Sequence, residues 1–102
     1  MKQINEQEFE KVTKSGVVLV DFFATWCMPC RMMSQILEGV ASEIAGKAEI
    51  YKVDVDECEN LARQFGVMSI PTLVLFKDGQ VVEKHVGVMQ QADCVNAIKK
   101  YL

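Results

Sequence analysis

Residues Val17 to Met33 read VVLVDFFATWCMPCRMM, and this segment carries the strongest structural signals in the sequence. Its first part, Val17 to Phe23, is apolar except for one acid, a composition typical of a central strand that is covered on both faces. A short turn ends in a Cys-x-x-Cys sequence, and apolar residues at helical spacing begin directly after it. The stretch therefore predicts a strand, a turn and a helix N-terminus, with two thiols at the junction.

Cys27 and Cys30 form this Cys-x-x-Cys motif, which indicates redox chemistry. Two cysteines at this spacing on the first turn of a helix can close a disulfide with little backbone movement. The helix N-terminus carries partial positive charge and unpaired N–H groups, and both favour a thiolate. Pro29 suits this turn because its missing N–H has no cost there and its φ is already fixed.

Geometry assigns different roles to the two thiols. Cys27 lies at the tip of the predicted helix, so we expect its sulfur to be exposed and to act as the nucleophile. Cys30 lies one turn further in, so we expect it to be shielded and to act as the resolving thiol. Exchange would run through a mixed disulfide on Cys27 that Cys30 displaces.

A structural zinc site is the main alternative for these cysteines. Such a site usually has four ligands, often from two cysteine pairs or from a cysteine pair and a histidine pair. The sequence offers one pair, a distant His85 and two isolated cysteines, Cys58 and Cys94. The missing second pair favours redox use, and we expect no metal. Cys94 falls on an apolar helix face, where a cysteine behaves as a small hydrophobe.

On either side of the motif, the sequence predicts alternating helices and strands. Asn5 followed by Glu8 is a capping pattern that opens a short helix ending near Gly16. After the cysteines a longer helix stops at about Gly46, and its apolar stripe consists of Met33, Ile36, Leu37, Val40 and Ile44. Ala48 to Val55 is predicted as the next strand.

The C-terminal half continues this order. Asp56 with Glu59 is another capping pattern, which predicts a helix through about Phe65. Thr72 to Phe76 and Val81 to Val86 are strands around the hairpin turn KDGQ, and a final helix follows. The order is βαβαβαββα, which predicts a single α/β domain over residues 1–102 with a central mixed sheet, mainly parallel with an antiparallel hairpin, flanked by helices.

The amino-acid composition argues against several classes of function. The chain has 102 residues, of which 50% are hydrophobic, and a net charge of -3 without a basic cluster, so we expect no nucleic acid partner. No apolar run is long enough to span a bilayer, and the N-terminus MKQINE lacks the apolar core of a signal peptide. We therefore expect a cytoplasmic protein, in which cysteines are more often free or catalytic than structural.

Four segments, in this order and spacing, resemble the thioredoxin family. Asp21 to Cys27 resembles the family's strand and the tryptophan that leads into its first cysteine, and Ile70-Pro71-Thr72 resembles its cis-proline loop. Phe76 to Gly79 resembles its hairpin, and Val86-Gly87 resembles the last loop beside the cysteines. Four such segments are far more specific than a lone Cys-x-x-Cys, and they imply the thioredoxin fold.

Asp21 interrupts the buried strand, where an acid is costly. One interpretation is a bulge or an edge position at which the carboxylate reaches water. The resemblance instead implies a buried acid behind the cysteines, with a raised pKa, that takes the proton of Cys30 as that thiol attacks. Lys52 matches the family's lysine near this acid, where it would lower the cost of ionising the carboxyl.

Pro71 fits an edge strand, but the resemblance implies a cis Ile70–Pro71 bond in a loop that lies against the disulfide. The backbone of this loop would pair with an extended substrate chain. The resemblance further implies an apolar docking surface around Cys27, formed by Trp26, Met68, Ser69, Ile70, Pro71, Gly87 and Val88. A flat apolar surface would accept many partners.

Met28 departs from the family pattern, which has Gly-Pro between the cysteines where this chain has Met28 and Pro29. In the family these two residues help to set the redox potential, so we expect Met28 and Pro29, with Lys52, to tune it. Methionine adds a flexible apolar contact beside the nucleophile and removes the backbone freedom of glycine.

The resemblance implies a protein disulfide reductase that needs no bound cofactor beyond its own Cys27–Cys30 disulfide. A thioredoxin reductase would recycle it, its clients would be diverse proteins with accessible disulfides, and we expect a monomer without membrane contact. A disulfide oxidase or isomerase is one alternative, although the loop lacks the histidine of oxidising relatives. A thioredoxin-fold binding module is another, although both cysteines, Asp21 and Pro71 are present.

Overall fold

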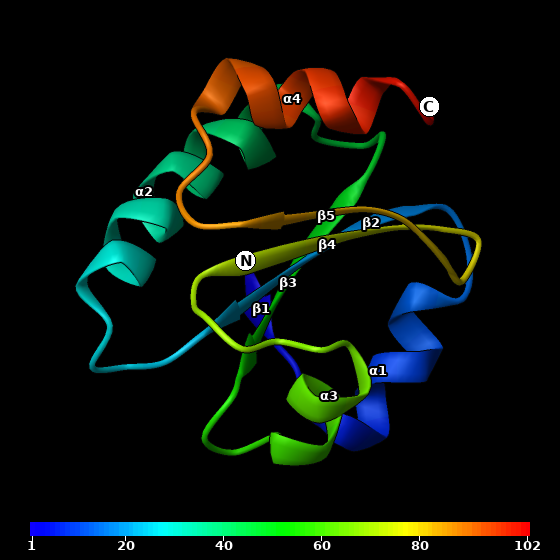
Figure 1. Ribbon diagram of the computed structural model, residues 1–102. Helices are drawn as coiled ribbons and strands as arrows, with labels where there is room; N and C mark the ends of the chain where they lie inside the picture. Colours follow the sequence, from blue (N-terminus) through cyan, green and yellow to red (C-terminus); the bar gives the residue numbers. More distant parts are fainter.

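The computed structural model describes residues 1–102, and its element order is the predicted βαβαβαββα (Figure 1). The elements are β1 Lys2–Gln3, α1 Glu6–Thr13, β2 Val17–Phe23, α2 Met28–Glu43, β3 Glu49–Asp54, α3 Glu59–Gln64, β4 Thr72–Lys77, β5 Gln80–Val86 and α4 Gln91–Lys99. A membrane crossing would need a longer and more apolar helix than any of these four.

The strands form one five-stranded sheet in the order β1-β3-β2-β4-β5. β1 and β2 both pair with β3 in parallel, whereas β4 is antiparallel to β2 and β5 is antiparallel to β4. This mixed sheet confirms the predicted fold class. β2 lies at its centre, and every residue from Val17 to Phe23 is buried, as the unbroken apolar run indicates.

Helices cover both faces of the sheet. Figure 1 shows α2 and α4 on one side and α1 and α3 on the other. Side chains alternate along β2, so Val17 and Leu19 pack with α2 and α4, whereas Val18, Val20 and Phe22 pack with α1 and α3. The core therefore has two layers, and β2 contributes to both.

Local sequence signals explain several of the element ends. Asn5 caps α1 with a complete capping box, because its side chain accepts from the Glu8 N–H and the Glu8 side chain accepts from the Asn5 N–H. The hairpin between β4 and β5 turns through Asp78 and Gly79, both at positive φ, which suits a tight two-residue turn. α2 is continuous from Met28 to Glu43, with the proline in its first turn.

The predicted start of α3 at Asp56 is wrong, because the helix begins at Glu59. Cys58 occupies the N-cap position and makes no side-chain capping bond. Asp56 is engaged elsewhere: its N–H donates to Asp54 Oδ1 over 2.8 Å, and its own carboxylate accepts from a tryptophan in another loop. A long-range contact therefore displaces the local capping pattern.

Candidate active site

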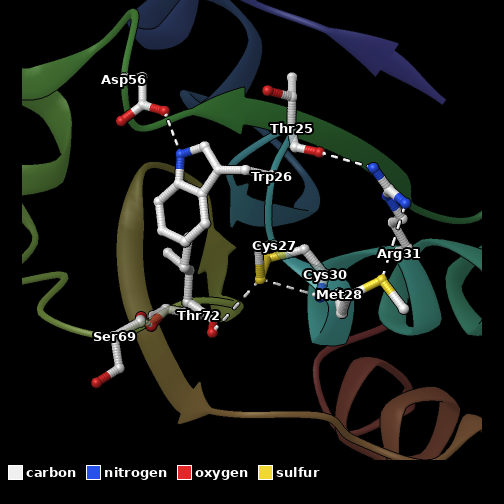
Figure 2. Close-up of a disulfide and its surroundings, with 10 residues drawn as sticks. Thr25, Trp26, Cys27, Met28, Cys30, Arg31, Asp56, Ser69 and Thr72 are labelled. Carbon is white, nitrogen blue, oxygen red and sulfur yellow. Dashed lines mark hydrogen bonds between the residues drawn. A yellow bond between two sulfur atoms is a disulfide. The ribbon is translucent and has the colours of Figure 1, made fainter.

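Cys27 and Cys30 are joined by a disulfide at the N-terminus of α2. Cys27 is the N-cap residue of the helix, and Cys30 lies in its first turn. The Cys30 backbone N–H donates to Cys27 Sγ over 3.2 Å, so a helix N-terminal donor points at this sulfur (Figure 2). When the disulfide is reduced, the same donor stabilises negative charge on Cys27.

Both cysteines are buried, which contradicts the expectation that Cys27 is exposed. Cys27 is 4% exposed and Cys30 is 2% exposed. The loop before Pro71 accounts for this, since the carbonyl oxygen of Ile70 lies 3.8 Å from Cys27 Sγ and Ile70 packs on the cysteines. Position at a helix tip does not predict exposure when a segment distant in sequence folds over it.

The Ile70–Pro71 peptide bond is cis, as the resemblance implied. Two hydrogen bonds hold the loop around it: the Thr72 hydroxyl donates to the carbonyl of Ser69, and the Gly87 N–H donates to the carbonyl of Pro71 over 2.8 Å. The structure therefore brings the Ser69–Pro71 loop and Gly87 together beside the disulfide.

Trp26 directly precedes Cys27 and is 68% exposed. Its Nε1–H donates to Asp56 Oδ2 over 2.8 Å, which fixes the orientation of the indole ring (Figure 2). Sequence reasoning missed Asp56 as a site residue, because its place before Glu59 indicated only a helix cap. Neither residue carried a sequence signal for a contact across 30 positions.

Large apolar side chains are exposed around the disulfide. Met28 is 69% exposed and Met68 is 96% exposed, and both belong to the predicted site. Met32, one helical turn after Met28, is also exposed and was missed. Val86, which pairs with Thr72 next to the cis-proline, is exposed too; the resemblance places it in the loop beside the cysteines but not in the docking surface. Ile70, Gly87 and Val88 are half-buried, and Pro71 is buried.

Arg31 places a cation next to the Cys-x-x-Cys turn. Its Nη2 donates to the carbonyl of Thr25 over 3.3 Å, and its Nη1 lies 3.8 Å from Met28 Sδ (Figure 2). These contacts bridge the two ends of the turn and hold positive charge near the sulfurs, where it favours a thiolate.

Asp21 is fully buried in the centre of the sheet. It pairs in regular register with Lys52 on β3 and Leu73 on β4, so the alternative of a bulge or an edge position is wrong. Neither carboxylate oxygen has a hydrogen-bond partner. Burial raises the pKa of Asp21 to about 7, against a smaller lowering by the Lys52 charge. The carboxyl can therefore exchange a proton near neutral pH.

Lys52 lies beside this acid but does not form an ion pair with it. Its Nζ donates to Ser34 Oγ on α2 over 3.0 Å and lies 4.3 Å from the centroid of the Phe23 ring. Sequence reasoning missed Ser34, which carries no motif and is recognised only from this contact.

The two other cysteines are reduced and lie outside the disulfide. Cys94 is buried on α4, as predicted, and burial raises the pKa of its thiol to about 11. Burial and neighbouring carboxylates raise the pKa of Cys58. Both thiols are therefore poor nucleophiles at neutral pH. No three His, Cys, Asp or Glu side chains gather where they could hold a metal ion.

Comparisons with known proteins agree with this geometry. A family model described as Thioredoxin matches residues 1–100. A thioredoxin from Staphylococcus aureus is 46% identical over 100 residues, which cover 98% of this chain and 96% of the relative.

Solved structures give the same result. A mutant thioredoxin from Halobacterium salinarum NRC-1 is similar with a TM-score of 0.88 at 38% identity, over 98% of this chain and 90% of that chain. A chloroplastic thioredoxin z is similar with a TM-score of 0.90 at 27% identity, over 99% of this chain and 93% of that chain. Because the family match covers nearly the whole chain and the two motif cysteines pair as a disulfide, the chain belongs to the thioredoxin family and is a thiol–disulfide oxidoreductase.

Proposed function

We propose that the protein works in the reducing direction and passes two electrons from its dithiol to disulfides in client proteins. The observation that carries exchange through Cys27 is the Cys30 N–H that donates to Cys27 Sγ over 3.2 Å, whereas the reducing direction rests on membership of the thioredoxin family. This donor stabilises the Cys27 thiolate, which is the attacking form in thiol–disulfide exchange.

The reaction has two steps. The Cys27 thiolate attacks one sulfur of the client disulfide, forms a mixed disulfide and releases the other client sulfur as a thiolate. Cys30 then loses its proton to Asp21 and attacks Cys27 Sγ, which releases the client's second thiolate and closes the Cys27–Cys30 disulfide. The burial of Asp21 and its pKa of about 7 support the role of proton acceptor.

The client docks on the exposed residues around the disulfide. Trp26, Met28 and Met68 provide apolar area, and flexible methionine side chains adapt to different partners. The loop of Ser69, Ile70 and Pro71, with Gly87 and Val88 beside it, offers backbone groups to an extended client segment. Met28, Pro29 and Lys52 tune the potential of the couple.

Family membership supports the remaining parts of the proposal. A thioredoxin reductase returns two electrons to the disulfide, and the clients are diverse proteins with accessible disulfides. The chain acts as a monomeric single domain in the cytoplasm, without a bound cofactor. A midpoint potential near the reducing end of the thiol–disulfide range, about −270 mV, supports this direction, whereas one near about −120 mV contradicts it and favours the oxidase.

A trapping experiment tests the two cysteine roles. Cys30→Ser keeps the nucleophile and removes the resolving thiol, so mixed disulfides with proteins of a cell extract should accumulate until a reductant is added. Cys27→Ser is the matched control and should trap at least about tenfold less, because the remaining thiol lies one turn deeper in the helix. Non-reducing gels of the two variants give the result.

Each other outcome of this experiment contradicts part of the proposal. Equal trapping by both variants contradicts the assignment of roles. No trapping by either variant contradicts client reduction through a mixed disulfide. A joint loss of zinc and of stability in both variants, without covalent complexes, indicates a metal site instead.

A further inference from the structure

Lys52 and Asp21 lie opposite each other in the parallel pair of β2 and β3, so their side chains leave the same face of the sheet. Neighbouring strands are about 4.8 Å apart, and a lysine side chain is long enough to bring its ammonium onto the carboxylate. Nevertheless, the three ion pairs of the protein involve other residues, and both Asp21 oxygens stay without a partner. Other contacts must therefore keep the Lys52 ammonium away from the Asp21 carboxylate.

Two contacts account for the position of the ammonium. Ser34 Oγ accepts its hydrogen bond over 3.0 Å, and the Phe23 ring lies beneath it at 4.3 Å. Ser34 is on α2, four residues after Cys30, at the wall of an open groove of about 340 Å³ that both residues line. The hydroxyl therefore anchors Lys52 at the groove, next to the reacting cysteine.

We propose that Ser34 is a positioning residue: its hydroxyl holds the Lys52 ammonium away from Asp21, so the buried carboxyl stays unpaired and able to accept a proton. The inference rests on the proposed role of Asp21 as proton acceptor. A carboxylate locked in an ion pair with Lys52 would be a weaker base for Cys30, because the pair stabilises its ionised form.

The charged and titratable groups around this pair come from three elements. Lys52 is on β3, whereas Cys30, Arg31 and Glu38 line the groove from α2, and Cys94 faces Asp21 from α4. Among these, only Lys52 opposes the effect of burial on the Asp21 pKa. Burial has the larger effect on the pKa of Asp21, and the position of one ammonium determines how far that effect is opposed.

Without the Ser34 hydroxyl, the Lys52 ammonium could pair with either of two carboxylates, those of Glu38 and Asp21. Glu38 is exposed and hydrated, whereas Asp21 is buried and lacks any partner, so the attraction to Asp21 is less screened. Ser34→Ala should therefore let Lys52 pair with Asp21. The pKa of Asp21 should fall by about one pH unit or more, the usual effect of an opposite charge in contact.

The test is a titration of the Asp21 carboxyl carbon by NMR in the oxidised protein. Ser34→Thr keeps a hydroxyl and should titrate like the wild type. Lys52→Met should raise the midpoint, and adding Ser34→Ala to Lys52→Met should change nothing further, because Ser34 acts through the ammonium. With Ser34→Ala, the acidic limb of the pH profile for insulin disulfide reduction should shift to lower pH by the same number of pH units as the Asp21 midpoint.

Three results would overturn the proposal: an unchanged midpoint in Ser34→Ala, a raised midpoint, or an effect of Ser34→Ala that persists in the Lys52→Met background. The titration uses oxidised protein without a client, so it is read independently of turnover. Failure of the proposed function would appear separately, as wild-type protein that does not reduce insulin.

Discussion

The two faces of β2 are built on the same strand but differ in one respect. Towards α1 and α3, Val18, Val20 and Phe22 pack against a cluster of rings, with Phe65 centred 5.2 Å from Phe9 and 5.5 Å from Phe76. Towards α2 and α4, the apolar series is interrupted by Asp21, whose two oxygens have no partner. One face is optimised for packing, and the other tolerates a destabilising group next to the cysteines.

The largest effect on stability should come from the aromatic face. Phe22 is fully buried and its ring lies 6.1 Å from that of Phe65, so Phe22→Ala should lower the free energy of unfolding by about 3–5 kcal/mol. The rate of insulin reduction per folded molecule should not change. Urea unfolding and the reduction assay measure the two quantities.

If Phe22→Ala does not fold, Phe22→Leu gives a smaller loss by the same mechanism. A reduction rate that falls while the variant is fully folded would contradict the separation of the two faces.

On the other face, Asp21→Asn should stabilise the protein at pH 7 by up to about 4 kcal/mol. The folded-state pKa of about 7 lies above the ordinary value of 3.8, and each unit of difference corresponds to about 1.4 kcal/mol. Because the folded state binds the proton more tightly, the wild type should lose stability as the pH rises from about 4 to 7. The variant should lack this loss.

Unfolding by urea at pH 4 and pH 7 checks the stability, and the two proteins should be nearly equal at pH 4. The same variant should reduce insulin more slowly at neutral pH, because its amide cannot accept the Cys30 proton. Greater stability with unchanged turnover would contradict the role of Asp21 as proton acceptor and would show only that the buried acid destabilises the fold.

The smallest effect on stability should come from Met28, at the exposed end of the reactive side. Met28 is 69% exposed, so Met28→Gly should change the free energy of unfolding by no more than about 1 kcal/mol, mainly through backbone entropy. The midpoint potential should nevertheless shift by about 10–20 mV, because about 30 mV corresponds to 1.4 kcal/mol. Glutathione redox titration measures it.

Val81→Ala is the control, since Val81 is 48% exposed and belongs to β5, outside the proposed site. Equal potentials for wild type and Met28→Gly would exclude Met28 as a tuning residue.

The features that the sequence predicts correctly depend on local pattern. The apolar run of β2 predicts a central strand, and the capping pair Asn5 and Glu8 predicts the start of α1. The cysteine spacing predicts the disulfide, since one helical turn brings the two sulfurs together. Each of these signals lies within a few residues of the feature that it predicts.

The features that the sequence does not reveal depend on contacts between distant segments. Cys27 is buried because the loop of Ile70 covers it. Asp56 does not cap α3, because its carboxylate accepts a hydrogen bond from Trp26 instead. Ser34 contacts Lys52 only because α2 crosses the face of the sheet beside β3. Such contacts form only in the packed fold, so no local sequence pattern predicts them.

The indole that Asp56 holds beside the disulfide has a practical consequence for spectroscopy. Trp26 is the only tryptophan in the chain, and it directly precedes Cys27. All tryptophan emission therefore arises at one position, next to the bond that opens and closes during exchange. Because the indole is exposed and held by a single hydrogen bond, its emission reports on the reacting end of the molecule without an added label.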